Sequence, residues 1–394
     1  MEDFTDPAVT DLAFTDLAFT ELAGAVADET SGALLHLGDP VREQRALERG
    51  DALAPLGDRT VIELTGTERL TWLDSITSQS VARLAAGEST ELLVLDPQGR
   101  IEHVAAIFDD GSSTWLIADA ADAEPLATWL LRMRFRAAAT IGVRHDLAVV
   151  GFFGGGAAER RAEQAALSPH GTAVVWTDPW PTVQPGGHQY HDGAEHPGAG
   201  YHWRTAVVDA AGAEMVVADA QAEWAGLLAA EALRVAAWRP RWAAEVDERS
   251  IPHETDWIRS AVHLAKGCYR GQETVAKVHN LGHPPRRLAM LHLDGSENVL
   301  PAPGDAVLAG DDEAGRVTSV ARHHELGPIA LAILSRRAPT GDVVVRTAEA
   351  DVAAAQEVIV PADAGSTADV PRLTRLSRRA TAPDPRESDP RESR

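Results

Sequence analysis

The sequence has a single cysteine, Cys268, among its 394 residues. One cysteine excludes an intrachain disulfide framework, and it also excludes a four-thiolate iron–sulfur site built by one chain alone. No apolar run approaches the ~20 residues that a membrane-spanning helix needs. The chain begins with acidic residues (Glu2, Asp3 and Asp6), whereas a secretory signal begins with basic ones. We therefore expect a cytoplasmic protein with no membrane attachment.

Basic residues are also few. The 36 Lys and Arg residues against 59 Asp and Glu residues give a formal net charge of −23. Because affinity for nucleic acids depends on neutralising phosphates, this balance argues against direct nucleic-acid binding, although it is compatible with a local basic patch. Hydrophobic residues make up 44% and charged residues 24% of the chain, as in ordinary globular proteins. The length is enough for two or three domains with cores of their own.

Both ends of the chain lack a pattern that could bury a face. Near the N-terminus FTDLA recurs with a period of five residues up to residue 23, and this period matches neither a helix nor a strand. At the C-terminus DPRES is repeated over residues 384–393. Proline and charge without apolar residues are typical of disorder. We predict a disordered extension over residues 1–30 and a disordered tail over residues 364–394.

Between the ends, the pattern changes from mixed helix and strand to strand alone. Strands are predicted over residues 60–66, 91–96, 101–108, 114–119, 146–153, 204–208 and 274–279. Helices are predicted over residues 70–76, from Pro125 as a first position, from residue 157, and from residue 221 to Pro240. Short β runs follow residue 286 at residues 288–293, 306–309, 316–321, 329–334 and 342–346. Runs of this kind predict a small barrel or sandwich.

The predicted fold class is α+β. Two α+β units occupy residues 31–284, and a small β-barrel occupies residues 285–363. A stretch rich in proline, glycine and histidine at about residues 178–202 is interpreted as a surface loop or linker between the two units.

Charged and flexible residues surround Cys268. A thiol reacts as its thiolate, and its free pKa is about 8.5. Lys266 and Arg270 lie two residues to either side and carry positive charge that favours the thiolate. The remaining neighbours can turn backbone amides toward a ligand or add an amide and a carboxylate: Gly267, Gly271, Gln272 and Glu273. The pattern indicates a polar site around a nucleophile or soft ligand, with a buried, inert cysteine at a tight turn as the alternative.

Residues 266–273 read KGCYRGQE and resemble the signature octapeptide of the YgfZ family. The resemblance continues in the expected order through LTGTERLTWLDSITSQSV (64–81), LDPQGRIEH (95–103), EALRVAAWRPRWAAEVDERSIPHE (231–254) and HPPRRLAML (283–291). It covers about residues 56–338. It implies a three-part fold like that of the glycine-cleavage aminomethyltransferase, tetrahydrofolate binding, and support of iron–sulfur enzymes, among them one that thiolates tRNA.

The resemblance also implies roles for single residues. Cys268 and Lys266 would form the functional centre. The folate contacts would come from Tyr269, Gly271, Gln272, Glu273 and Arg234, with Arg234 and Glu273 as candidate polar anchors of the pterin. The implied partners are tetrahydrofolate and iron–sulfur client or assembly proteins, and no metal site is predicted within the chain itself.

The sequence departs from the catalytic aminomethyltransferases in two places and from the YgfZ pattern in one. Those enzymes have paired aspartates where this chain has Glu102 and His103, and a pterin-clamping glutamate that is missing from the nearest equivalent turn, DAAG at residues 209–212. A carboxylate that orients a cofactor and handles a proton is hard to replace. Within the YgfZ pattern, Trp238 stands where a glycine is usual, an exchange that would narrow the folate cavity if the side chain points into it.

Two other functions stay open from the sequence. One is a folate-dependent one-carbon transferase or demethylase, with Glu102 or His103 as proton handler, and the other is a scaffold in which the motif only shapes a turn. A zinc site is disfavoured because only His279 and His283 have ligand-like spacing, across a glycine and next to a proline. The histidines at 188, 191, 196 and 202 are predicted to be exposed. GFFGGG at residues 151–156 does not fit a dinucleotide-binding loop.

Overall fold

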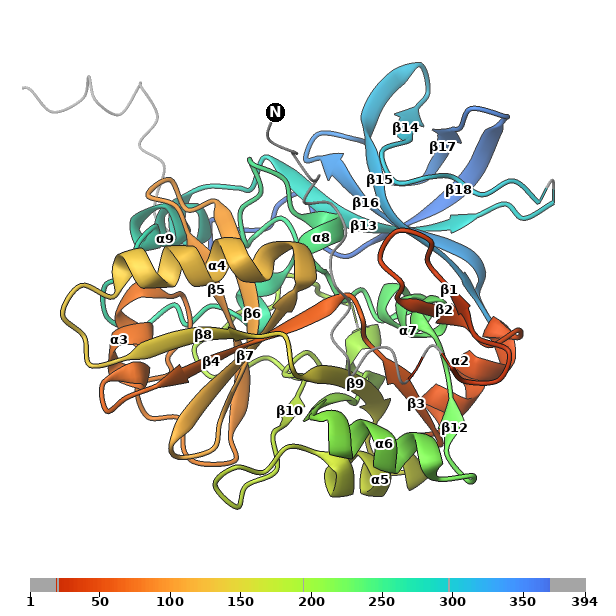
Figure 1. Cartoon of the computed structure of the whole chain (residues 1–394). Coiled ribbons are helices and arrows are strands. Elements are labelled where there is room, and N and C mark those ends of the chain that lie inside the picture. Colours follow the sequence, from red (N-terminus) through yellow and green to blue (C-terminus); the bar gives the residue numbers. More distant parts are fainter. Residues whose placement is uncertain (1–18, 20, 194, 297, 369–394) are drawn as a thin grey trace, which may run out of the picture.

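The computed structural model describes residue 19 and residues 21–193, 195–296 and 298–368. These residues form two five-stranded sheets with flanking helices and a closed barrel, as Figure 1 shows. The predicted α+β class with a C-terminal barrel is therefore confirmed. Within the described ranges, no helix is both long and apolar enough to cross a membrane.

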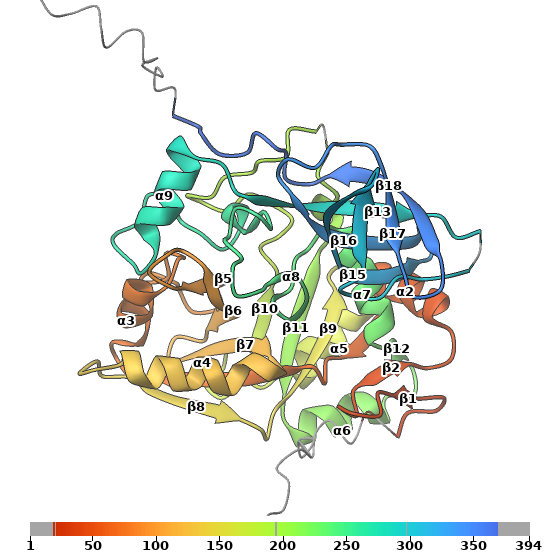
Figure 2. The same cartoon turned by 90° about the horizontal axis from the view of Figure 1, so that it is seen from above.

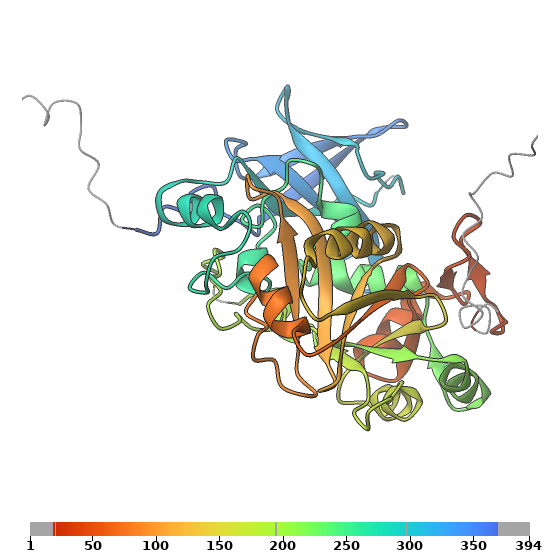
Figure 3. The same cartoon turned by 60° about the vertical axis from the view of Figure 1, so that its left-hand side comes forward.

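The first sheet has the strand order β5-β6-β7-β4-β8 with antiparallel neighbours. Its strands are β4 (Arg59–Thr65), β5 (Ser89–Leu95), β6 (Ile101–Asp109), β7 (Ser113–Asp119) and β8 (Thr140–Arg144). One face packs its apolar side chains against α3 (Arg69–Ile76) and α4 (Ala120–Met133), which cover that face in Figure 3. Because side chains alternate along a strand, the other face carries Val104 and Ala106, which line the cavity described below.

The second sheet has the order β10-β11-β9-β3-β12. Its strands are β3 (Ala52–Pro55), β9 (Ala148–Phe153), β10 (Val175–Thr177), β11 (Trp203–Val208) and β12 (Glu223–Trp224). Helices α5 (Ala157–Ala165) and α6 (Ala210–Ala218) cover its outer face. On the barrel side, α2 (Pro40–Glu48) and α7 (Leu227–Ala236) pack against each other. A two-stranded ribbon of β1 (Val26–Ala27) and β2 (Leu34–His36) lies beside them.

The barrel closes in the order β13-β16-β15-β14-β17-β18. Its strands are β13 (Arg286–Leu293), β14 (Ala306–Ala309), β15 (Asp312–His323), β16 (Gly327–Ser335), β17 (Asp342–Arg346) and β18 (Asp351–Val358). The sequence pattern predicted the first five of these strands but not β18. That strand is rich in alanine and closes the barrel by pairing with β13, so its identity depends on a partner more than 50 residues away. Figure 2 shows the barrel beside α2 and α7.

The segment after the motif is helical, which makes the predicted strand over residues 274–279 wrong. Helix α9 (Gln272–Leu281) begins directly after Gly271. The β-branched residues in this stretch favoured a strand, but only Val275 is buried, and its carbonyl accepts a hydrogen bond from His253 at 3.1 Å. Local propensity was overridden by tertiary contacts at one side of the segment.

Two helix starts also differ from the prediction. The helix expected from residue 221 begins at Leu227, because Trp224 belongs to β12 and pairs with β3, and Leu228 is 45% exposed. Pro125 is the sixth residue of α4 and not its first. A short helix, α8 (Trp242–Glu245), follows Pro240.

The stretch at residues 178–202, predicted to be a surface loop or linker, has both exposed and buried residues. Trp180 is fully buried, and Tyr190 and His196 are 7% exposed each. In the described part of this stretch the one helical element is a short 3₁₀ turn over Pro197–Gly200, so buried aromatic side chains anchor it. Of the predicted exposed histidines in this stretch, His202 is exposed and His196 is not.

Residues 1–30 were predicted to be disordered, and most of that extension lies outside the described residues. Within the described part, Phe19 is 1% exposed and its ring lies 5.5 Å from that of Trp224, while β1 pairs with β2. At the other end, the amide of Thr367 donates to the carbonyl of His279 in α9 at 3.0 Å. The tail beyond residue 368 lies outside the described residues.

Candidate functional site

The motif loop, residues 266–273, is held against the turn between β5 and β6. Gly271 has φ of +84°, a left-handed conformation that L side chains rarely adopt. A Cβ at this position would lie 2.6 Å from the carbonyl oxygen of Asp96 and 3.0 Å from the Cα of Gly99. Both the backbone conformation and the close approach therefore require glycine. The resemblance assigned Gly271 to folate binding, whereas its observed contacts are with the protein's own backbone.

Lys266 anchors the N-terminal end of the loop. Its Nζ donates to the carbonyl oxygens of Asp74 at 2.6 Å, Thr77 at 2.9 Å and Gln79 at 2.6 Å, all at or just beyond the end of α3. Burial lowers the pKa of Lys266, and the nearby Asp74 carboxylate opposes this shift. An ammonium group has three N–H donors, so these carbonyls occupy all of them. Lys266 is thus a positioning residue, and its predicted effect on the thiol stays a prediction.

Cys268 is exposed and forms no disulfide. The next residue, Tyr269, is buried, and its ring lies 5.4 Å from the Lys266 ammonium. Burial raises the pKa of Tyr269, and its hydroxyl has no hydrogen-bond partner among the described residues. Gln272 donates back to the carbonyl of Lys266 at 3.1 Å, which closes the loop on itself. The loop is therefore anchored by buried groups and presents its only sulfur to the outside.

Arg270 and Glu102 connect the loop to the first sheet. They form an ion pair in which both side chains are about one-third exposed (32% and 34%). The carbonyl of Glu102 accepts a hydrogen bond from the indole of Trp242 at 3.0 Å, and Trp242 lines the central cavity. One residue of β6 thus contacts both the motif loop and the cavity wall.

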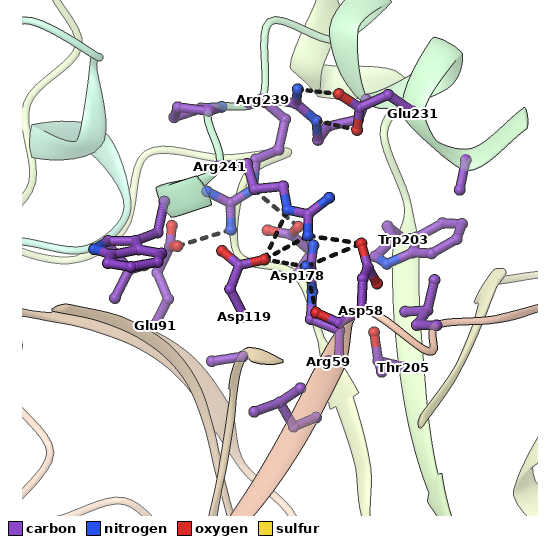
Figure 4. Close-up of a pocket in the computed structure, with 18 of the residues that line it drawn as sticks. Asp58, Arg59, Glu91, Asp119, Asp178, Trp203, Thr205, Glu231, Arg239 and Arg241 are labelled. Carbon is purple, nitrogen blue, oxygen red and sulfur yellow. Dashed lines mark hydrogen bonds and ion pairs between the residues drawn. The ribbon is translucent and has the colours of Figure 1, made fainter. Parts of the chain in front are cut away.

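The central cavity lies between the two sheets and has a volume of about 250 Å³. Figure 4 shows its polar floor and one of its aromatic walls. The aromatic lining residues are Trp176, Tyr201, Trp203, Trp242 and Trp257. Strands β6, β7, β10 and β11, helix α7 and the segment at residues 239–242 all contribute side chains. This position, between two sheets and under a helix, is where planar apolar ligands with a few polar groups commonly bind.

Arg239 is the centre of a buried charge group at the cavity. Its guanidinium contacts the Asp178 carboxylate at 3.0 Å and the Glu91 carboxylate at 2.7 Å, and it lies 5.1 Å from the ring centre of Trp180. Burial, opposed by the charge of Arg239, raises the pKa of Asp178 to about 6, and Glu91 adds to the rise. One nitrogen of Arg239 and one oxygen of Glu91 lack hydrogen-bond partners among the described residues.

A second charge group lies at the other side of the cavity. Arg241 contacts both Asp119 and Asp58 at 2.6 Å, and Arg59 pairs with Asp119 as well. Burial disfavours the charged form of Asp119, but the charges of Arg59 and Arg241 outweigh it and hold the pKa of Asp119 below its usual range. The cavity therefore offers carboxylates and guanidinium groups that are held in ion pairs.

Arg234 also lines the cavity, but its donors are all used by the protein. Nε and one Nη bind Glu231 at 2.8 and 2.5 Å, and that same Nη donates to Ser319 of the barrel at 2.6 Å. The other Nη donates to the carbonyl of Arg239 and to Glu245 at 3.1 Å. The side chain joins α7 to α8 and β15, so it does not supply the free anchor that we expected.

Glu273, the other expected anchor, is exposed on α9 and makes no hydrogen bond or ion pair among the described residues. It is not among the cavity-lining residues, so the structure does not bring Glu273 and Arg234 together. Sequence reasoning missed the polar residues that do line the cavity: Asp58, Arg59, Glu91, Asp119, Asp178, Arg239 and Arg241. The run WRPRW at residues 238–242 was the available signal, because arginines between tryptophans need buried partners.

His103 and Trp238 point away from the cavity. His103 lies on the α4 side of β6, where its Nδ1 lies 2.6 Å from the buried Asp122 carboxylate. Trp238 has φ of +59°, a conformation that suits the usual glycine, and its indole donates to the sulfur of Met290 at 3.0 Å. Since Trp238 does not line the cavity, it does not narrow it as we expected.

The histidines near α9 form an aromatic cluster. The Tyr190 hydroxyl lies 2.9 Å from Nδ1 of His279, and the His188 and His279 ring centres are 4.8 Å apart. Among the residues that the structure describes, no group of three or more His, Cys, Asp or Glu side chains is placed to hold a metal ion.

A solved structure resembles the whole arrangement. The glycine cleavage system aminomethyltransferase T from Bartonella henselae superposes with a TM-score of 0.65 at 16% sequence identity, over 86% of this chain and 94% of the other. This likeness establishes an aminomethyltransferase-like fold. Aspartate kinase from Synechocystis matches with a TM-score of only 0.21 at 8% identity, over 73% of this chain and 41% of the other. No protein-family model matches the chain.

Proposed function

We propose that this protein binds tetrahydrofolate in the central cavity and uses Cys268 to support the assembly or maintenance of iron–sulfur enzymes, including tRNA-modifying ones. The observation that carries the proposal is an exposed thiol on a loop that is anchored by Lys266 and Gly271 and that contacts the cavity wall through Glu102, in an aminomethyltransferase-like fold. The similarity of KGCYRGQE to the YgfZ signature supports the same function.

The cavity residues fit a pterin ring. A pterin is flat and presents both N–H donors and acceptor atoms at its edge, so it needs aromatic walls and polar groups of both kinds. The tryptophans at 176, 203 and 242 supply the walls. Glu91 and Arg239 each retain one atom without a partner among the described residues, an acceptor and a donor. The volume of about 250 Å³ lies just below the usual ~300–1,000 Å³ of ligand pockets, so it suits the bicyclic ring and not a whole folate.

We assign Glu91, Asp178 and Arg239 as the groups that hold the pterin edge. When bound, tetrahydrofolate would supply a reduced ring that carries one-carbon units. The charge group of Arg239 is fixed by two carboxylates and stacked on Trp180, so it is oriented before the ligand arrives.

The placement of Glu102 and His103 weighs against methylene transfer by this chain. The Glu102 carboxylate is paired with Arg270, and His103 faces α4 and Asp122. A general base must reach the proton that it removes in the bound ligand. Neither side chain lines the cavity, and these were the two candidates for proton handling.

Cys268 is assigned as a shared or transient ligand, or as a redox thiol. A cluster held by thiolates commonly needs four, and this chain has one. A partner protein, a small thiol or a second copy of the chain must supply the rest. The exposure of the residue agrees with this need for a second source.

Titration of the protein with tetrahydrofolate, followed by tryptophan fluorescence and calorimetry, tests the binding part. Ala106→Phe places a ring in the cavity and should abolish binding, whereas Ala121→Phe adds the same ring at an exposed position and should not. Absence of binding at millimolar tetrahydrofolate would contradict this part of the proposal.

Complementation of a strain that lacks the equivalent protein tests the thiol part. Cys268→Ser should lose support of iron–sulfur client activity while retaining tetrahydrofolate affinity. Full complementation by Cys268→Ser would instead favour a scaffold in which the motif only shapes a turn.

A further inference from the structure

The C-terminal end of α4 carries an exposed group of apolar and basic side chains. Phe135 is 82% exposed, the largest exposed fraction among the big hydrophobic residues that the structure describes, and Leu131 is 49% exposed one turn earlier. Arg132 and Arg136 are exposed and form no ion pair among the described residues. We call Leu131, Arg132, Phe135, Arg136 and Arg270 the α4 patch. The loop that carries part of it joins α4 to β8 (Figure 1).

Folding does not explain the phenylalanine in this patch. Phe135 has φ of +47°, in the left-handed region that is sterically unfavourable for a non-glycine residue. Because the side chain is 82% exposed, its burial does little to offset this unfavourable backbone conformation. Strained, unburied side chains of this kind gather at functional surfaces. Aromatic and arginine side chains are also the types most enriched in protein interfaces.

The patch adjoins the motif loop. Arg132 and Arg270 line one shallow depression together with Glu102, Trp129 and Met133. Arg270 comes two residues after Cys268 and belongs to the motif loop. The patch and the motif loop thus share one depression, through Arg132 and Arg270.

The charge of the patch indicates the chemistry of its partner. The whole chain has a formal net charge of −23, yet the patch holds three arginines, of which only Arg270 is paired among the described residues, by Glu102. A polyanion such as RNA would be repelled by the rest of the surface and would gain few phosphate contacts here. A second copy of this acidic chain would be repelled as a whole as well. An acidic patch on another protein, with an apolar pocket for Phe135, matches both parts of the surface.

We propose that the α4 patch docks a partner protein that presents carboxylates around an apolar pocket, and that it seats this partner beside Cys268. The second part rests on the proposed function, because it identifies the partner as the protein that Cys268 serves. Phe135 is the apolar anchor, and Arg132 and Arg136 steer the approach and fix the orientation.

Site-specific photo-crosslinking tests the surface. The full chain with Phe135→p-benzoylphenylalanine is irradiated in the native cells, and the crosslinked protein is identified, purified and titrated against this chain by calorimetry at low and high salt. Loss of one interface anchor costs about 2 kcal/mol or more of binding free energy, so Phe135→Ser should raise the dissociation constant about thirtyfold. The double change of Arg132→Glu and Arg136→Glu should raise the dissociation constant about tenfold or more, and added salt should reduce this effect.

Matched controls come from the second unit. Met215 is 54% exposed on α6 and Arg160 is exposed on α5, so Met215→Ser and Arg160→Glu should leave binding within about twofold. Thermal melts should show that the patch variants fold as the wild type does, because the mutated side chains are exposed. The partner's own carboxylates, when changed to lysine, should restore binding to the Arg132→Glu and Arg136→Glu chain.

Several outcomes would overturn the proposal: no crosslink, a crosslink to RNA or to a second copy of this chain, or a purified partner whose affinity ignores the patch variants. Cys268→Ser should bind the partner as the wild type does. A chain that docks its partner but binds no tetrahydrofolate would contradict the proposed function and leave the docking surface standing. If the chain binds tetrahydrofolate but the patch variants leave the partner's affinity unchanged, the docking surface would be wrong and the proposed function would stand.

Discussion

The central cavity and the motif loop hold their charged side chains in different ways. In the cavity, Arg239 is 8% exposed and is surrounded by two carboxylates that come from other strands and loops. In the loop, the charged Lys266 is held by backbone carbonyls, and Arg270 is paired at the surface. The cavity is thus rigid because charges pair with charges, and the loop is rigid because one buried lysine and one glycine clamp its backbone.

The difference matters for function. A buried group of ion-paired side chains binds a polar edge without reorganising, which suits recognition of a small molecule. A clamped loop with an exposed sulfur at its centre suits contact with another protein. The two regions are in contact through β6, where Glu102 forms an ion pair with Arg270 of the loop and accepts a hydrogen bond from Trp242 of the cavity wall.

The largest expected difference between the two regions is in their arginine ion pairs. Arg239→Leu leaves Glu91 and Asp178 buried without a partner, and breaking such a pair costs about 3–5 kcal/mol of unfolding free energy. Arg270→Leu removes a pair that is one-third exposed, which costs about 0–1 kcal/mol. Urea unfolding at pH 7 measures both. Equal losses would mean that the two regions do not differ in the way described here.

The next effect concerns pH. The pKa of Asp178 is raised by burial from 3.8 to about 6, so the folded protein holds this proton more tightly than the unfolded chain does. The stability contributed by this protonation is fully present below about pH 4 and is lost as the pH rises through about 6. Between pH 4 and pH 7 the wild type should therefore lose up to about 3 kcal/mol relative to Asp178→Asn, since a tenfold change in proton affinity corresponds to about 1.4 kcal/mol.

Paired unfolding curves at several pH values check this prediction, with Asp146→Asn as the control. Hydrogen bonds from Arg144 hold the pKa of the exposed Asp146 carboxyl below its usual range. Its contribution is present above about pH 4 and is lost as the pH falls, so the difference should have the opposite sign. If the difference in unfolding free energy between the wild type and Asp178→Asn did not change between pH 4 and pH 7, Arg239 would be keeping Asp178 charged over that whole range.

A smaller effect is expected from the glycines of the loop. Gly271→Ala forces a Cβ against the Asp96 carbonyl in a left-handed conformation and should cost about 2 kcal/mol. Gly267→Ala meets nothing within 4 Å and should stay within about 0.5 kcal/mol. Unfolding free energy and the alkylation rate of Cys268 are the measurements. If both variants behaved alike, the clamp at Gly271 would not hold the loop.

The smallest effect on stability is expected at Cys268, the residue that we propose to carry the function. Cys268→Ser changes an exposed atom that contributes nothing to packing, so the unfolding free energy should change by less than about 0.5 kcal/mol. Thermal unfolding checks this value alongside the complementation assay. A loss above 1–2 kcal/mol, well outside the ~0.5 kcal/mol of surface substitutions, would indicate that the sulfur packs in the native state.

The strands of the first sheet could be predicted because they alternate strongly, and the structure places β4 to β7 within two residues of the predicted bounds. The same reasoning failed at α9, where β-branched residues are helical, and at Trp224, where a residue at helical spacing belongs to a strand. In both places one long-range contact outweighs local propensity. In the stretch at residues 178–202, the pattern did not indicate that Trp180, Tyr190 and His196 are buried, because their contacts are with parts of the chain distant in sequence.

The local sequence alone was enough to identify the motif loop as a candidate functional site. Lys266, Cys268 and Gly271 lie within six residues, so their chemistry is visible without a fold. The cavity could not be found this way, because its polar groups come from positions 58, 91, 119, 178, 239 and 241 and meet only when two sheets and a helix pack together. Tertiary structure also decided that Lys266 is a clamp and that Arg234 is fully paired, since hydrogen-bond partners distant in sequence use up their donors. A residue's type sets which bonds it can form, and packing decides which of them are left for a ligand.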